Sequence, residues 1–170
     1  GEQSDGSILV PTNQLLRPAG FQVYFPGRPV DLVLIPDKGL LAVKNKNSLD
    51  LIRLSDRTIL QSLQFQKSGS SFKGIYYSES KRKIFLTDAE NLLLVAGFDD
   101  KNILSWQTPV KMPKPSVGGD PVPGGICFDE SENRIFITLS RNNSLAVINV
   151  TDSSVVEIPV GIAPYDVALK

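Results

Sequence analysis

Apolar residues along this chain occur in short runs that are separated by Asn, Asp, Gly, Ser and Pro. The runs are rich in Val, Ile, Leu and Phe, a composition that is typical of β-strands. Several runs, including residues 40–43 and 92–96, are almost continuously apolar instead of alternating. Such runs predict strands in a sheet that is covered on both faces. Because no segment combines helix caps with a sustained helical period, the pattern predicts an all-β fold.

The predicted strands recur in a repeat. The equivalent positions Asp31, Gly74, Gly125 and Asp166 are separated by 43, 51 and 41 residues. A period of about 40 to 50 residues with four short strands is typical of a β-propeller blade. We therefore expect a partial propeller in residues 8–170, with blades at 27–63, 70–108 and 122–160 and the first strand of a further blade at 161–170. An insertion at 109–121, rich in Pro and Gly, accounts for the long middle step and predicts an extended loop.

The two ends of the chain carry partial repeats. Residues 20–29 parallel residues 155–164, so the chain is expected to enter on the fourth strand of one blade and to leave on the first strand of another. Residues 1–7 are interpreted as a flexible start that includes the remnant of a tag. Two architectures fit: a fragment of a roughly seven-bladed ring, or a compact four-bladed ring whose fourth blade is assembled from 8–10, 21–25 and 165–169. An open arc exposes strand edges and apolar faces, which predicts closure of the chain on itself or a homodimer through its ends.

Composition excludes several classes of function. Lysine plus arginine equals aspartate plus glutamate, 18 against 18, and no basic stripe with interleaved aromatics is present, so we expect no nucleic-acid partner. No run approaches the about 20 apolar residues that span a bilayer. The chain has no histidine and a single cysteine, which removes the commonest general base, the usual nucleophile pairs and cysteine zinc sites. We therefore predict no cofactor and no bound metal.

The candidate binding residues gather on one face of the predicted ring. In a blade whose strands run up and down, the loop between strands two and three shares a face with the loop that leads to the next blade, and loops on a rigid scaffold are where binding residues concentrate. The residues expected there or at the adjacent channel are Arg28, Asp31, Asn45, Asn47, Asp88, Asn91, Arg141, Asn142, Asn143 and Asp166. The alternative is that the asparagines only supply turn geometry.

Asp31 and Asp166 allow two interpretations. Each follows a proline by two residues at the start of an innermost strand, so the pair could line the channel and coordinate a cation or a polar ligand. The favoured alternative is that each hydrogen-bonds the backbone of the neighbouring blade, because Gly74 and Gly125 occupy this position in the other repeats.

Three other features receive structural interpretations. The carboxylate pairs 99–100 and 129–130 fall at expected turns, and adjacent strand residues point to opposite faces, so neither pair suits acid–base catalysis. Cys127 is expected to be a small buried hydrophobe. Trp106 is expected to pack within the sheet rather than to stack on a sugar.

The last repeat carries a family resemblance. The strand 134–139, the turn 141–144, the strand 145–149 and the segment 157–167 resemble the YVTN β-propeller repeat of YncE-like and surface-layer-type proteins. Residues 8–14 and 16–20 resemble the opening segment of a subgroup in which the propeller precedes an alkaline-phosphatase-like domain. The sequence in hand holds none of that second domain, so the resemblance implies no phosphatase activity for it. It implies a non-enzymatic binding or interaction module that is exported to the periplasm or the extracellular space, and that would form the N-terminal part of a larger phosphoesterase-linked protein.

A propeller hydrolase or lactonase is the rival interpretation. Such an enzyme would use Asp and Glu with a divalent cation at the central channel. Three or more carboxylates converging on the channel would favour the enzyme, whereas scattered carboxylates would favour binding.

Overall fold

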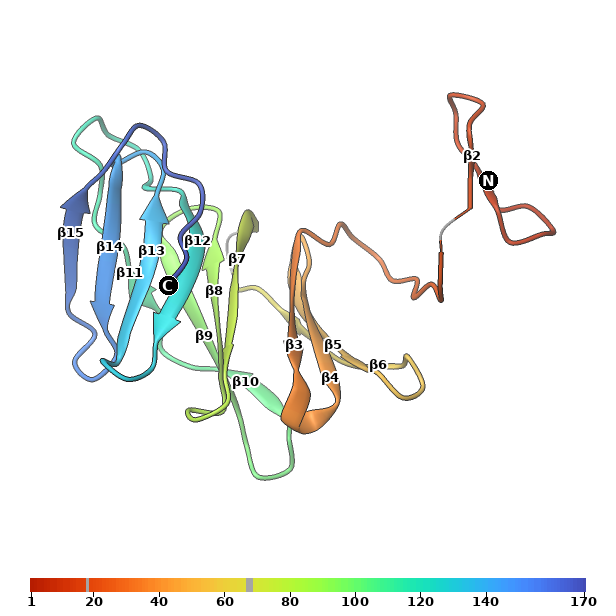
Figure 1. Cartoon of the computed structure of the whole chain (residues 1–170), viewed down its shortest axis with the longest axis horizontal. Coiled ribbons are helices and arrows are strands. Elements are labelled where there is room, and N and C mark those ends of the chain that lie inside the picture. The colour runs from red at the N-terminus through yellow and green to blue at the C-terminus, as the bar shows by residue number, and fades with distance from the viewer. Residues whose placement is uncertain (18, 67–68) are drawn as a thin grey trace.

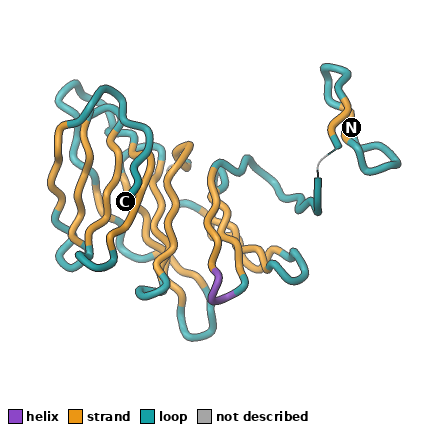
Figure 2. The backbone as a smooth tube through the Cα atoms, in the orientation of Figure 1, coloured by secondary structure: helices purple, strands orange, loops and turns teal. Residues whose placement is uncertain are grey.

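The computed structural model describes residues 1–17, 19–66 and 69–170 and places strands along nearly half of that length. Figures 1 and 2 show an all-β molecule whose only helical element among the described residues is a single 3-10 turn, η1 (Pro36–Lys38). The strands are β1 (Ile8–Leu9), β2 (Leu15–Leu16), β3 (Asp31–Ile35), β4 (Leu40–Lys44), β5 (Ser48–Arg53), β6 (Ile59–Gln64), β7 (Ser70–Ser78), β8 (Lys83–Asp88), β9 (Leu92–Phe98), β10 (Leu104–Trp106), β11 (Val110–Lys111), β12 (Pro123–Asp129), β13 (Arg134–Leu139), β14 (Ser144–Asn149) and β15 (Val155–Pro159). The all-β prediction is confirmed.

Three antiparallel sheets follow one another along the chain, and we call them blades one, two and three. Their strand orders are β3-β4-β5-β6, β7-β8-β9-β10 and β12-β13-β14-β15, so each strand pairs with its neighbour in sequence. The three blades stand side by side in Figure 1. The outer edge of blade two is divided, because β10 and the short strand β11 both pair with β9. The insertion expected to be only a loop therefore contributes a short strand.

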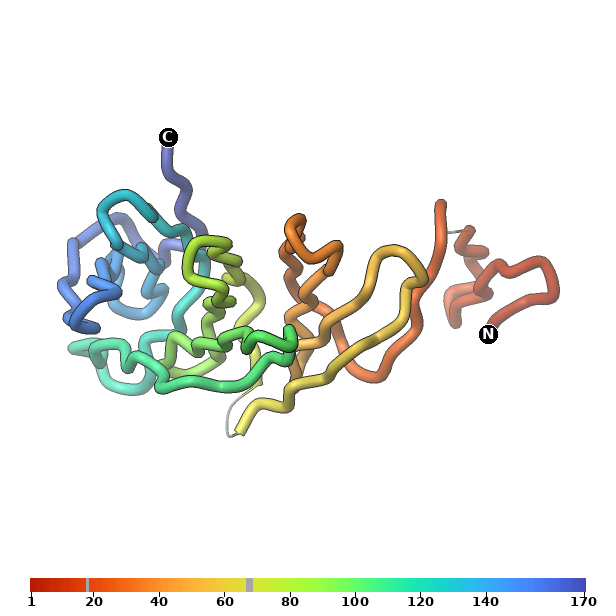
Figure 3. Tube along the Cα trace, turned by 90° about the horizontal axis from the view of Figure 1, so that it is seen from below, coloured from red at the N-terminus to blue at the C-terminus, as the bar shows by residue number. Residues whose placement is uncertain are grey.

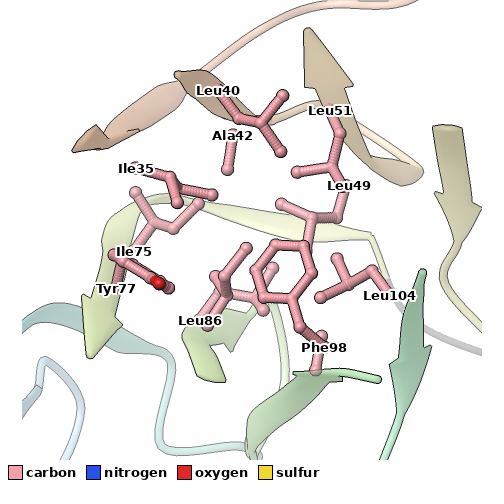
Figure 4. Packing of buried hydrophobic residues seen from close by; sticks show 12 residues of the cluster. Ile35, Leu40, Ala42, Leu49, Leu51, Ile75, Tyr77, Leu86, Phe98 and Leu104 are labelled. Carbon is pink, nitrogen blue, oxygen red and sulfur yellow. The ribbon is translucent and has the colours of Figure 1, made fainter. Parts of the chain in front are cut away.

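Two apolar clusters hold the blades together. One lies between blades one and two, where Ile35, Leu49, Leu86 and Phe98 are buried (Figure 4). The other lies between blades two and three. Strand β8 contributes to both, because Ile84 and Leu86 belong to the first cluster while Phe85 belongs to the second. Coverage on both faces is the physical reason that the central strands read as continuous apolar runs.

The ends of the chain do not close a ring. Ile8 pairs locally with Leu16 in a hairpin, and residues 21–25 form no strand, with Phe21 stacked against Arg57 and 82% exposed. Residues 161–170 also form no strand, although the Tyr165 carbonyl accepts a hydrogen bond from Gly125 N at 3.0 Å. The two termini lie at opposite ends of the molecule (Figures 1 and 3). The four-bladed alternative is therefore wrong for this structure, because the described terminal segments do not pair with each other as strands of a fourth blade.

Candidate functional site

One side of the molecule collects the turns inside the blades and the linkers between them, as the repeat predicts. Ser70 N donates to Lys46 O at 3.0 Å, Val122 N to Glu90 O at 3.1 Å, and Arg141 N to Pro121 O at 3.1 Å. Each contact joins a β-turn of one blade to the linker that leads into a blade. We call residues 45–47, 89–91 and 140–143, with the linker residues that they contact, the loop face. It lies at the upper edge of the blades in Figure 1, away from η1.

Most of the predicted asparagines on the loop face hold the linkers in place. Asn45 is 3% exposed: its Oδ1 accepts hydrogen bonds from Arg28 N and Lys46 N, both at 2.7 Å, and its Nδ2 donates to Pro26 O at 2.7 Å. Asn143 Oδ1 accepts a hydrogen bond from Ala163 N at 3.0 Å. The alternative that these asparagines serve turn and linker geometry therefore describes Asn45 and Asn143 well.

The remaining candidates on the loop face differ in their hydrogen bonds and in the exposure of their side chains. Asn142 Nδ2 donates to Pro113 O at 3.2 Å, while its Oδ1 is buried without a hydrogen-bond partner among the described residues. Asn91 Nδ2 donates to Asp120 Oδ1 at 3.1 Å. The side chains of Asn47 and Arg141 are exposed. The exposed pair is therefore accessible to a ligand as it stands.

The three predicted aspartates each make a different contact within the fold. Asp31 Oδ2 accepts a hydrogen bond from Gly74 N at 2.8 Å, which is the favoured contact with the neighbouring blade. Asp88 is fully buried and its Oδ1 accepts from the backbone N–H groups of its own turn, at residues 90 and 92. Asp166 forms an ion pair with Lys73, a residue that the sequence did not single out. Within the described part of the chain, no group of three or more Asp, Glu or Cys side chains could hold a metal ion.

A repeated contact between blades was also missed from the sequence. Thr87 Oγ1 lies 3.0 Å from Gly124 O of the next blade, and Thr138 Oγ1 lies 3.2 Å from Tyr165 O. Lys44 occupies the equivalent place in blade one, and its ammonium donates to Lys73 O at 2.8 Å. The repeat itself marks this position, since Lys44 follows Val43 as Thr87 follows Leu86.

Lys44 is fully buried between blades one and two. Besides Lys73 O, its Nζ lies within hydrogen-bond distance of three further oxygens: Ser71 Oγ at 2.8 Å, Gly74 O at 3.1 Å and Thr87 Oγ1 at 3.2 Å. Burial lowers the pKa of Lys44 to about 7, against the opposing attraction of Asp31 and Asp88. The contact therefore joins blades one and two through a lysine whose protonated form is destabilised by burial.

Two cavities open at the loop face. The first, of about 320 Å³, lies on the outer side of blade one and is lined by Asn45, Asn47, Asp50 and Ser62 together with Phe25 and Ile59. The second, of about 260 Å³, lies between the inner strands β7 and β12, and its lining includes Ala89, Lys73 and Tyr165. A cavity of this size admits a small molecule.

Trp106 and Cys127 take the structural places expected for them. Trp106 Nε1 donates to Gln64 O of blade one at 2.8 Å, and its ring lies 5.7 Å from that of Phe65. Cys127 is 9% exposed, and burial raises the pKa of its thiol. A buried thiol of raised pKa is a poor nucleophile.

Comparison with known proteins identifies the fold but not a family. A scan against protein-family models finds no match, and a search of curated proteins finds none either. Among solved structures, the chain is similar to a functionally unknown protein from Desulfotomaculum acetoxidans DSM 771, with a TM-score of 0.67 and 18% identity over 95% of this chain and 52% of that one. It is also similar to the RRP9 WD40 repeats (TM-score 0.64, 17% identity, 82% and 40% covered) and to a putative 6-phosphogluconolactonase of Bacteroides fragilis (TM-score 0.65, 14% identity, 86% and 43% covered).

These likenesses confirm the predicted partial β-propeller. The chain spans about half or less of the length of each of the three structures. At such low identities the similarity concerns the fold, and functions differ widely among proteins that share one.

None of the described residues belongs to a helix long and apolar enough to cross a bilayer.

Proposed function

We propose that this chain is a non-enzymatic β-propeller binding module of the YVTN or YncE-like kind, and that the loop face is its binding surface. The observation that carries the proposal is that some of the predicted polar side chains make contacts inside the fold, while others are exposed on the loop face. Asp31, Asp88 and Asp166 are engaged by backbone amides or by Lys73, which leaves them as supports of the scaffold. Exposed side chains and two cavities remain available on the same face.

The rival enzyme has weaker support. Three or more carboxylates brought together at the channel would favour a lactonase or hydrolase that uses a divalent cation, and no such group is present among the described residues. The similarity to a putative 6-phosphogluconolactonase concerns the fold. Export to the periplasm or the extracellular space is part of the proposal and rests on the resemblance of the last repeat to exported YVTN proteins.

A thermal-shift screen with small polar metabolites tests the binding surface. We expect ligands that raise the melting temperature, and we expect this shift to be lost in Asn47→Lys or in Ala89→Lys, which block the first and second cavity respectively. Thr151→Lys adds the same charge at an exposed turn on the opposite face and serves as the control. The binding surface lies elsewhere if the shift in melting temperature disappears in Thr151→Lys but persists in both Asn47→Lys and Ala89→Lys.

Hydrolysis separates the two classes of function. Incubation with aldonolactones and a divalent cation is expected to give no release of acid above the uncatalysed rate. If the wild type releases acid and Asp31→Asn does not, the chain is an enzyme and the binding-module proposal is wrong.

A further inference from the structure

Besides Lys44, blade one departs from the other blades at a second buried position. In blades two and three, the residues that pair with Leu86 and Ile137 on the adjacent strand are Leu94 and Ala146. In blade one the corresponding residue pairs with Val43 and is Asp50. The repeat thus replaces an apolar side chain with a carboxylate at a position that faces the preceding repeat.

The Asp50 carboxylate is buried without a cation from the part of the chain that the structure describes. Asp50 is 2% exposed, and its Oδ2 accepts hydrogen bonds from Asn45 Nδ2 at 3.0 Å and from Ser48 Oγ at 3.1 Å. Both donors are neutral. No donor among residues 1–17, 19–66 and 69–170 contacts Oδ1, and no lysine or arginine of those residues forms an ion pair with Asp50. Buried charges in proteins are paired with an opposite charge, and the described residues supply no cationic partner for this carboxylate.

Asp50 forms part of the wall of the cavity of about 320 Å³ on blade one. Phe25 and Ile59 supply apolar surface, whereas Ser62 and Gln64 supply a hydroxyl and an amide. Lys46 also lines the cavity, and its exposure places it toward the solvent. The space is far larger than a bare metal ion needs, and a calcium ion takes six to eight oxygen ligands, whereas Asp50 is the single carboxylate among the residues that line this cavity.

The geometry points to Asp50 as the anchor of a site for a small organic cation, which carries one primary ammonium or guanidinium group on a short apolar chain. The cationic group would donate to Asp50 Oδ1, and the chain would lie against Phe25 and Ile59. The inference deepens the proposed function, on which it rests, by assigning a ligand class to one cavity of the loop face.

The test uses n-butylammonium and butylguanidinium as probes, with 1-butanol as the neutral analogue of the same chain length. Binding is followed by NMR through the backbone amide signals of Asn45 and Asn47. We expect saturable shifts with both cations and none with 1-butanol. We expect the dissociation constants to rise about tenfold or more in Asp50→Asn, which is the loss expected for a hydrogen bond to a charged group.

Two further variants keep the result interpretable. Asp56→Asn makes the same change of charge at an exposed aspartate in the β5–β6 turn and should leave the affinity unchanged. Ser62→Leu narrows the cavity at the exposed strand position that pairs with Asp50 and keeps the carboxylate, and should weaken binding even where Asp50→Asn fails to fold. Folding of each variant is checked through the fluorescence of Trp106.

Several results would overturn the inference. The cavity is not a cation site if 1-butanol binds as well as the two cations. The same conclusion follows if the affinities are equal in wild type, Asp50→Asn and Ser62→Leu. A third contrary result is that Asp50→Asn changes only the molecular mass of the protein in solution, as measured by light scattering. The positive charge opposite Asp50 would then come from the surface of another protein molecule, and the inference would be wrong. Loop-face ligands from the metabolite screen could still exist in either case, so the proposed function stands or falls separately.

Discussion

Lys44 is the residue whose replacement tests the blade contact most directly. Its ammonium is buried between blades one and two, and its pKa is lowered from 10.5 to about 7. In the unfolded chain the side chain returns to water and binds its proton up to about pH 10. Between pH 7 and pH 10.5 the unfolded state therefore holds more protons than the folded state, so the free energy of unfolding must rise with pH in this window. Below pH 7 both states are protonated and the contribution is constant.

The magnitude follows from the size of the pKa change. One pKa unit corresponds to about 1.4 kcal/mol, so Lys44 should add up to that amount per pH unit above pH 7, of order 4 kcal/mol by pH 10. Lys44→Met removes this contribution while keeping much of the side-chain volume. The acceptor Lys73 O keeps hydroxyl partners in the variant, because Ser71 Oγ and Thr87 Oγ1 both lie 2.8 Å from it.

The assay is urea unfolding followed by the fluorescence of Trp106, the only tryptophan, at intervals between pH 5 and pH 10. The quantity of interest is the free energy of unfolding of wild type minus that of Lys44→Met. We expect this difference to be flat below pH 7 and to rise above it. Lys46→Met removes an exposed lysine from the adjacent turn, and its curve should stay parallel to that of wild type. A difference for Lys44→Met that remains flat from pH 7 to pH 10 would refute the argument.

Three other predictions concern the scaffold. Gly74→Ala should destabilise the fold by several kcal/mol, because φ of Gly74 is +106° and a Cβ there would lie 2.1 Å from Gly124 O. Urea titration measures the free energy of unfolding, and a decrease of less than about 1 kcal/mol would contradict this prediction. Trp106→Phe should cost about 1 kcal/mol through the lost hydrogen bond to Gln64 O, read by circular dichroism during urea unfolding, and an unchanged midpoint would oppose this role. The exposed apolar ends of the arc, at Leu32 and Val156, should cause self-association in a concentration series of light scattering, whereas a monomer at every concentration would argue against it.

Local patterns in the sequence determined the architecture of this protein. Four short apolar runs recur about every 40 to 50 residues, and each run forms a strand because its neighbours in sequence are also its partners in the sheet. The near-continuous burial of runs such as residues 92–96 was readable for the same reason, since a blade between two others has no wet face. The placement of the turns on one face followed from strand direction alone.

The roles of individual polar side chains were decided only by the tertiary structure. Asn45 and Asn47 are neighbours in the same turn, yet one is buried under the incoming linker and the other is exposed, because only Asn45 meets Pro26 and Arg28. Lys44 resembles an exposed loop lysine until Lys73, 29 residues further along the chain, supplies a buried acceptor.

Asp50 and the chain ends depend in the same way on contacts between distant segments. The cavity beside Asp50 forms where the segment at Phe25 crosses blade one, and periodicity within a strand carries no information about that crossing. The terminal segments resemble strands of a ring, but a strand needs a partner at hydrogen-bond distance, and the structure places the two ends apart. Sequence periodicity therefore determined the blades, whereas burial, charge and closure were determined by which blades meet.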